Sequence, residues 1–469
     1  MIKSIYTLLF AAAASIGDLQ AQSQGKQPNV VVILADDLGY ADVGFNGCKD
    51  IPTPNIDKIA KNGVIFKNGY VSFAVCGPSR AGLITGRYQD RFGYSRNPLY
   101  APQDAGMGLP LTEETMADIL KRNGYYSTAI GKWHLGTHPD LHPQKRGFNE
   151  FFGFLEGGHH YMPEMWTLHD DTKAKTQYDG YKTKILRNTT PIDEKEYLTD
   201  ALSREAVSFI DKNAQKPFFI YLAYNAPHTP LQATSKYLER FNNIQNPKRK
   251  TYAAMVSAMD DGIGTVLQKL KEKGLEENTM VVFLSDNGGP TNDNGSNNRP
   301  LRGQKSNFWD GGIKVPFAIQ WPAKIKAGTI YEKPIISFDI LATVAGEINA
   351  QINPKKPLDG VNLIPFISSK NNKVPHDYLF WRGFDRGIAA VRTEFDKMVV
   401  IKDASQELFK SIKDVSEKNN LIEQDRKTFD LLMERWKIWN KELIDPIFLG
   451  LSHDKKYNEL NPKRFVFEK

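Results

Sequence analysis

Acidic and amide side chains follow two short apolar runs of the sequence. Asp36 and Asp37 end the run NVVVILADD, and Asp286 and Asn287 follow the apolar part of TMVVFLSDNGG. These four hard oxygen donors suit Ca²⁺ or Mg²⁺, whereas zinc or copper would require several His or Cys ligands. Either pair alone could simply cap a turn or a helix. The recurrence of the pattern after two similar runs points to a divalent cation site.

Cationic side chains occupy comparable positions. Lys132 and His134 lie two residues apart in GKWHLG, so on a strand they point to the same face, and His228 ends another apolar run in NAPHTP. Lys305 lies in PLRGQKSNFWDGG, a loop flanked by glycines. Each residue taken singly is typical of a solvated surface. Gathered beside a metal ion, the set would attract and orient a tetrahedral anion such as sulfate or phosphate.

One of only two cysteines in the 469 residues, Cys76, lies in VCGPSRAGLITGR. Pro78 and Ser79 are typical of the first turn of a helix, which places Cys76 just ahead of the helix N-terminus. The dipole and free amides there favour a thiolate or an oxyanion. A thiol hydrolase would need a base such as His134, but a soft thiolate matches a hard cation poorly. From the residues alone, Cys76 is a buried spacer, a nucleophile or the precursor of another group.

The elements that must position these side chains are apolar segments separated by helical patterns. Near-continuous apolar runs predict strands buried on both faces, as in a parallel sheet, at Asn29–Asp37, Tyr125–His134, Pro217–His228 and Thr279–Gly289. Helices are predicted over Thr112–Gly124, with Thr112 as the N-cap, and over Tyr252–Gly274. This alternation predicts an α/β fold with helices on both faces of the sheet. Because ligands gather beyond the carboxyl ends of such strands, residues far apart in the sequence are expected to share one pocket.

The chain is longer than the roughly 250–300 residues at which a single core stops growing. Its composition and hydrophobic pattern divide it into three parts. Residues 1–21 have the layout of a signal peptide, 22–370 carry the α/β pattern, and 371–469 predict a smaller subdomain. The last part contains two apparent antiparallel strands, DYLFWRG and GIAAVRTEF, and an amphipathic helix over 418–443. The polar segment 170–190 is expected to be a surface insertion.

The N-terminal run is too short to span a bilayer, and no other segment is long and apolar enough, so we expect export and no membrane insertion. The net charge of +7 mildly favours an anionic partner but decides nothing alone. We expect no nucleic-acid partner.

The Cys76 segment is also the most specific motif in the chain. C-G-P-S-R-A-G-L-I-T-G-R matches the C-x-P-S-R-x-x-x-x-T-G signature of the type I sulfatases. Further matches, in ADDLGY, PTPNIDKIAKNGVIF, GKWHLG, NAPHTP, SDNGG, PLRGQKSNFWDGGIKVPF and AVRTEFDKMV, extend the resemblance over most of the chain. The resemblance implies the alkaline-phosphatase-like fold: a large mixed, mostly parallel sheet with helices on both faces, plus a smaller C-terminal α+β subdomain with an antiparallel sheet.

The same resemblance implies a sulfuric ester hydrolase and a role for each site residue. In that family the motif cysteine is oxidised to formylglycine, an aldehyde used as its hydrate, so a formylglycine-generating maturation enzyme would act on Cys76. One Ca²⁺ would be held by Asp36, Asp37, Asp286 and Asn287, with residue 76 completing the site. By resemblance, Arg80 and Lys132 would activate the hydrate, Lys305 would bind the sulfate oxygens, His228 would protonate the leaving oxygen, and His134 would deprotonate the second hydroxyl to expel sulfate.

The expected substrate is a sulfated carbohydrate such as ulvan, carrageenan or a glycosaminoglycan, hydrolysed in the periplasm of a Gram-negative bacterium. Two alternatives remain: a phosphate or phosphonate monoester hydrolase of the same superfamily, and a catalytically silent carbohydrate-binding relative. Several residues near the motifs could contact a sugar or be ordinary surface residues: Tyr94, Arg96, His159, His160, Arg299, Arg302, Trp309 and Arg382.

Overall fold

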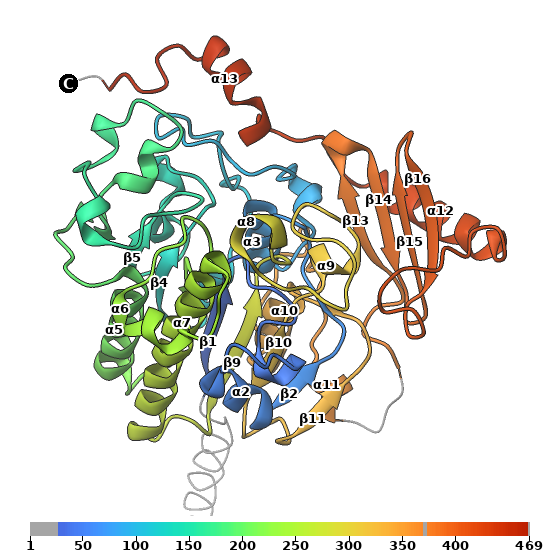
Figure 1. Ribbon diagram of the computed structural model, residues 1–469, viewed down its shortest axis with the longest axis horizontal. Helices are drawn as coiled ribbons and strands as arrows, with labels where there is room; N and C mark the ends of the chain where they lie inside the picture. The colour runs from blue at the N-terminus through green and yellow to red at the C-terminus, as the bar shows by residue number, and fades with distance from the viewer. Residues whose placement is uncertain (1–26, 369–372, 468–469) are drawn as a thin grey trace, which may run out of the picture.

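A computed structural model describes residues 27–368 and 373–467, so the signal peptide predicted over 1–21 lies outside the described residues. All four predicted strands are confirmed, as β1 (Asn29–Ala35), β4 (Tyr126–Lys132), β8 (Phe218–Ala223) and β9 (Thr279–Ser285). They lie side by side in the order β9-β1-β8-β4, and every neighbouring pair is parallel. Their carboxyl ends therefore open onto one edge of the sheet (Figure 1).

Among the described residues, ten strands form this mixed sheet, in the order β11-β2-β10-β9-β1-β8-β4-β5-β6-β7. The central strands from β9 to β5 are parallel, whereas β10 runs antiparallel to both of its neighbours. The outer strands are β11 (Thr329–Tyr331), β2 (Val64–Phe66), β10 (Phe317–Gln320), β5 (Glu150–Phe154), β6 (Leu186–Arg187) and β7 (Thr190–Pro191). A separate parallel pair joins β3 (Gly69–Tyr70) to β12 (Ile335–Ile336).

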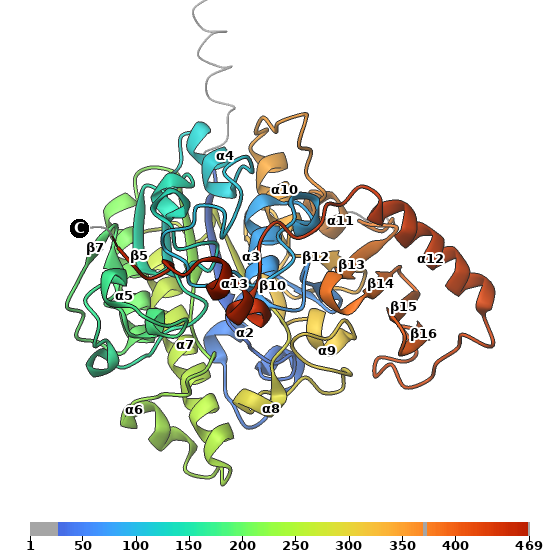
Figure 2. The ribbon, with the colours of Figure 1, turned by 90° about the horizontal axis from the view of Figure 1, so that it is seen from above.

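Strand β1 explains why the sequence reads as an unbroken apolar run. Val30, Val32 and Leu34 lie in one buried core, and the alternate residues Val31 and Ile33 lie in the other. The first core is covered by α3 (Cys76–Thr85), α4 (Met116–Arg122) and α10 (Asp339–Glu347), and the second by α2 (Pro54–Lys61), α5 (Leu198–Asn213) and α7 (Pro247–Glu272) (Figure 2). A strand between two helical layers has no solvated face, so period-2 alternation disappears.

Helix ends follow capping chemistry that the sequence analysis missed. The predicted N-cap Thr112 is wrong: α4 begins at Met116, after Thr115. The Thr115 hydroxyl accepts from the backbone N–H of Asp118 at 3.1 Å, and the Asp118 carboxylate accepts from the N–H of Thr115 at 2.9 Å. This reciprocal capping box satisfies two N–H groups at once. Helix α7 also begins earlier than predicted, at Pro247, because the Asn246 side chain caps it.

The C-terminal antiparallel sheet is confirmed, and it contains more strands than the two predicted. It comprises β13 (Leu379–Gly383), β14 (Ile388–Arg392), β15 (Asp396–Ile401) and β16 (Ser405–Lys410), paired in chain order. The helix predicted over 418–443 is shorter, α12 (Arg426–Asn440), and packs on this sheet to form a small core of its own. Figure 1 shows the unit beside the main sheet, on the side of α9.

The segment 170–190 is less superficial than predicted. Ala174 and Thr183 are buried, and the chain end packs along it. Arg464 is 5 % exposed and donates to the carbonyl of Tyr100 at 2.7 Å and to the Gln177 side chain. The remaining short helices are α6 (Ser235–Leu238), α8 (Thr291–Asn294), α9 (Asp310–Ile313), α11 (Ile364–Ser368) and α13 (Asp454–Leu460). Within the described chain, no helix combines the length and apolarity needed to cross a bilayer.

We expect Thr115→Ala to lower the free energy of unfolding by about 1–2 kcal/mol, because it removes the cap of α4. Denaturant unfolding followed by circular dichroism would measure the loss. Thr112→Ala, at the exposed position first taken for the cap, is the matched control and should change stability by less than about 0.5 kcal/mol. Equal losses in the two variants would contradict the assignment.

Candidate active site

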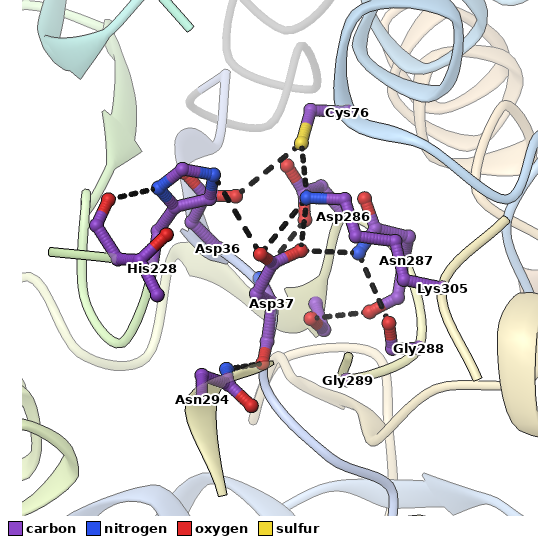
Figure 3. A network of polar contacts seen from close by, with 12 residues as sticks. Asp36, Asp37, Cys76, His228, Asp286, Asn287, Gly288, Gly289, Asn294 and Lys305 are labelled. Carbon is purple, nitrogen blue, oxygen red and sulfur yellow. Dashed lines mark hydrogen bonds and ion pairs between the residues drawn. The ribbon is translucent and has the colours of Figure 1, made fainter. Parts of the chain in front are cut away.

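Strand register brings the two acidic pairs together. Because β1 and β9 are parallel neighbours with Ala35 opposite Ser285, the residues that follow each strand emerge side by side. The backbone N–H of Asp286 donates to the carbonyl of Ala35 at 3.0 Å, and the N–H of Asp37 donates to Asp286 Oδ1 at 3.3 Å. Residues nearly 250 positions apart thus share one pocket, as predicted (Figure 3).

Cys76 lies over this acidic cluster. It is the first residue of α3 rather than the residue ahead of the helix, and it is buried. Its Sγ lies 3.6 Å from Asp36 Oδ1 and 3.2 Å from Lys305 Nζ. Ligand atoms of Asp36, Asp37, Cys76 and Asp286 all fall within 4.8 Å of one another. Side chains from three separated parts of the sequence therefore converge on the sulfur of residue 76.

The acidic cluster fits a hard divalent cation. Asp36, Asp37 and Asp286 are almost fully buried, and burial followed by the charge of Asp286 raises the pKa of Asp36 to about 7. Asn287 donates its amide hydrogen to Asp37 Oδ1 at 2.6 Å, while its own Oδ1 is buried with no hydrogen-bond partner. A buried carbonyl oxygen normally has a partner. Three carboxylates and an orphaned carbonyl form a donor set suited to Ca²⁺ or Mg²⁺.

Lysine and arginine side chains pair with the three carboxylates one for one. The pairs are Lys132 Nζ with Asp36 Oδ2 at 2.5 Å, Lys305 Nζ with Asp37 Oδ1 at 2.6 Å, and Arg80 Nη2 with Asp286 Oδ2 at 2.8 Å. Burial raises the pKa of Asp37, but Lys305 and His228 outweigh it and hold that pKa at about 2. With the side chains already balanced, a bound divalent cation would leave the pocket positive and favour an anion.

Both predicted histidines lie at the site, but the backbone conformation of His134 differs from the strand that was predicted. His134 lies beyond the end of β4 in left-handed backbone, with φ of 57°, so the predicted strand alternation with Lys132 does not apply. Its Nδ1 is buried without a partner, and burial, then the charge of Lys132, lowers its pKa far below the usual range. His228 Nε2 faces Asp37 Oδ2 at 3.6 Å, and burial lowers the His228 pKa to about 3. Both imidazoles are therefore neutral near pH 7.

Gly157 is a site residue that the sequence analysis missed. A Cβ at this position would lie 2.7 Å from His134 Nε2, so only glycine allows the imidazole its place. The Tyr94 hydroxyl donates to the carbonyl of His134 at 3.0 Å and supports the same turn. No local sequence pattern indicates the role of either residue, because each contacts His134 from a distant part of the sequence.

The thiolate interpretation of Cys76 finds no support. Burial raises the pKa of its thiol to about 12, although helix position alone favours the anion. One of the amides expected to stabilise negative charge is already used, because the Gly77 N–H donates to Asn97 Oδ1 at 2.8 Å. The encoded cysteine is therefore a neutral thiol in this pocket, and the pKa of Cys48 is likewise raised by burial, to about 11.

Most of the side chains considered as sugar contacts bind protein groups instead. Arg96 pairs with Asp385, Arg382 with Asp90, Arg302 with Glu407, Trp309 with Glu407, His159 with backbone carbonyls, and His160 with Gln232. Arg299 remains exposed. A cavity of about 690 Å³ lies beside the site, lined by residues such as Thr137, Glu156 and Lys184 but not by Cys76.

Comparisons with known proteins agree with this geometry. The family model described as Sulfatase matches residues 28–349, which include every side chain of the site. The chain belongs to the sulfatase family. Mouse arylsulfatase J is 36% identical over 344 residues, covering 73% of this chain but only 56% of that relative. Mouse N-acetylgalactosamine-6-sulfatase is 33% identical, covering 78% of this chain and 71% of its own.

One solved structure matches nearly the whole chain. The crystal structure of Ps i-CgsB in complex with k-i-k-neocarrahexaose is 38% identical, covers 94% of this chain and 100% of its own, and superposes with a TM-score of 0.86. The phosphonate monoester hydrolase of Agrobacterium radiobacter shares the fold, with a TM-score of 0.65, at 20% identity.

Proposed function

We propose that this protein hydrolyses the sulfate ester of a sulfated carbohydrate, using Cys76 after its conversion to formylglycine. The observation that carries the proposal is the position of Cys76 in the C-x-P-S-R motif. Its sulfur lies among Asp36, Asp37, Asp286 and the Lys305 ammonium, where an anionic group on the substrate would meet both a nucleophile and a cation. The family membership established above supports the same chemistry.

When present, the hydrated aldehyde at position 76 and a bound Ca²⁺ would supply an oxygen nucleophile and a positive charge beside it. Asp36, Asp37, Asp286 and Asn287 would hold the cation, since their oxygens converge and one of them is unpaired. Among the protein's own cations, the partly exposed Lys305 ammonium would bind sulfate oxygens. Buried Arg80 and Lys132 would hold the carboxylates in position.

The two imidazoles are assigned opposite proton transfers. His228 accepts or donates through Nε2, because its Nδ1 faces the carbonyl of Thr229 at 2.5 Å. Its Nε2 points toward Asp37 Oδ2, and we assign it the protonation of the departing sugar oxygen; this requires the imidazolium, which the negative charge of a bound sulfate would favour. His134 has an unpaired Nδ1 and is neutral, as a group that removes a proton must be.

For the substrate we propose a sulfated galactan oligosaccharide of the carrageenan type. The support is the match to Ps i-CgsB, whose structure holds k-i-k-neocarrahexaose and aligns over the full length of that chain. The predicted signal peptide further supports export to the periplasm, where polysaccharide fragments are degraded. The phosphonate hydrolase likeness concerns the fold alone.

The first test is sulfate release from carrageenan oligosaccharides, ulvan fragments and glycosaminoglycan disaccharides by protein coexpressed with a formylglycine-generating enzyme. Mass spectrometry of the peptide containing residue 76 reports the conversion. We expect hydrolysis by the converted protein, none by Cys76→Ala, and a loss of about a hundredfold for Lys305→Ala. Faster cleavage of a phosphate ester than of the matching sulfate ester would contradict the proposal, as would full activity with an unmodified thiol.

The second test concerns the cation. Adding Ca²⁺ to EDTA-treated protein should raise the thermal midpoint, because a ligand at about 100 times its Kd stabilises the folded state by about 2.7 kcal/mol. Asn287→Ala should weaken this response, whereas Asn292→Ala, which changes an exposed amide on the same side of the molecule, should keep it. If neither Ca²⁺ nor Mg²⁺ changes the thermal midpoint of the wild type, the proposed cation site is contradicted.

The third test concerns His134. Gly157→Ala should lower kcat by about tenfold to a hundredfold, because the new methyl group pushes the imidazole out of line. Gly106→Ala, at an exposed position where a new Cβ would closely meet only the Asp104 carboxylate, at 3.2 Å, is the control and should keep wild-type kinetics. Wild-type kcat in Gly157→Ala would show that His134 tolerates displacement and has no proton-transfer role.

A further inference from the structure

The loop that carries Lys305 is held to the main domain by hydrogen bonds and by the Lys305 ion pair, not by regular secondary structure. No helix or strand covers residues 295–309. The N–H of Lys305 donates to the carbonyl of Gly289 at a long 3.5 Å, and Ser306, in left-handed backbone with φ of 72°, donates to the carbonyl of Ala74 at 2.8 Å. The main sheet also holds the Lys305 ammonium through Asp37 Oδ1 at 2.6 Å, and the neighbouring Gln304 side chain accepts from the Thr291 hydroxyl at 2.8 Å.

A single carboxylate of the C-terminal sheet accepts hydrogen bonds from this loop on both sides of Lys305. Glu407, on β16, accepts from Arg302 Nη2 at 3.1 Å through Oε1 and from Trp309 Nε1 at 2.7 Å through Oε2. The Arg302 guanidinium also lies 4.1 Å from the centre of the Trp309 ring. Glu407 therefore ties together the two ends of the segment whose middle is Lys305.

A buried ion network anchors the end of the same loop to the C-terminal unit. Glu417 accepts from the N–H of Asp310 at 2.7 Å, and its carbonyl accepts from Arg302 Nη1 at 3.0 Å. Lys397, on β15 and fully buried, bridges Asp310 and Glu417 at 2.5 and 2.7 Å. Removing one member of such a buried network leaves an uncompensated charge and endangers the fold.

One further contact reaches the residue next to Lys305 itself. Arg386, in the turn between β13 and β14, donates to the carbonyl of Ser306 at 2.9 Å. The loop is thus held by the main sheet from one side and by the C-terminal sheet from the other.

We propose that Glu407 is a positioning residue, through which the C-terminal sheet sets where the Lys305 ammonium meets the substrate's sulfate. The inference rests on the proposed function for its catalytic consequence. Glu407 is the best point to test because it is half-buried and its carboxylate accepts from Arg302 and Trp309 rather than from Lys397 of the buried network. Misplacing a substrate-binding group by about 1 Å can cost about a hundredfold in rate.

The experiment is a double-mutant cycle on kcat/KM with the best sulfated saccharide from the screen. We expect Glu407→Ala to lower kcat/KM by about tenfold to a hundredfold in the wild-type background and by less than about twofold in Lys305→Ala, because it acts through Lys305. Glu407→Gln, which keeps one acceptor, should fall in between. Asp396→Asn breaks an ion pair with Lys410 on the same sheet, away from the loop, and should match the wild type.

A second readout does not depend on catalysis. Amide hydrogen exchange of the peptide covering 299–309 should quicken in Glu407→Ala and stay unchanged in Asp396→Asn. Unchanged exchange together with wild-type kinetics in Glu407→Ala would overturn the positioning role, as would equal losses in the two backgrounds of the cycle. If the wild type releases no sulfate from any saccharide, the proposed function fails, and the exchange result alone then decides whether Glu407 holds the loop.

Discussion

Three buried carboxylates within a few ångströms of one another are the constraint on which the rest of this structure depends. Burying like charges is unfavourable unless each is paired or binds a cation. The fold provides a cation from a different element for each: Arg80 from α3, Lys132 from the end of β4, and Lys305 from the loop before α9. The carboxylates can converge only because β1 and β9 are parallel neighbours in register. The topology of the sheet therefore determines the electrostatics of the site, because it brings the carboxylates and their cations to the same edge.

The sequence was a good guide wherever a physical rule is local. Continuous apolar runs ending in polar residues predicted all four central strands and the edge at which the site forms, because a strand buried on both faces has little choice of composition. The ends of the apolar runs and a glycine-flanked loop also predicted the cationic residues, the family motif around Cys76 added Arg80, and the structure brings them together. Helix ends were predicted less well: Thr112 and Thr115 are alike as caps in isolation, and the choice falls on Thr115 because Asp118 completes the box.

What escaped prediction acts across the fold. Gly157 matters because it allows His134 its position, and Glu407 because it reaches Arg302 and Trp309 from another sheet. The helix dipole does not make Cys76 a thiolate, for a similar reason. Burial dominates the pKa of the thiol over the field of one helix, and one of the helix amides already donates to Asn97. Desolvation and long-range contacts are properties of the assembled molecule, which no local pattern records.

The residues of the site with left-handed backbone differ in which part of the structure holds them. Asp37, His134 and Ser306 adopt positive φ without being glycine, a conformation that persists only where surrounding contacts impose it. Asp37 is held by the Asn294 amide of α8, which donates to its carbonyl, and His134 is held by Tyr94. Ser306 alone takes a hydrogen bond from the C-terminal sheet, through Arg386. The acidic cluster is thus fixed within the main domain, while the ammonium proposed to bind sulfate also depends on contacts with a second unit. In this arrangement the outer contacts of the loop are separate from the contacts that hold the carboxylates.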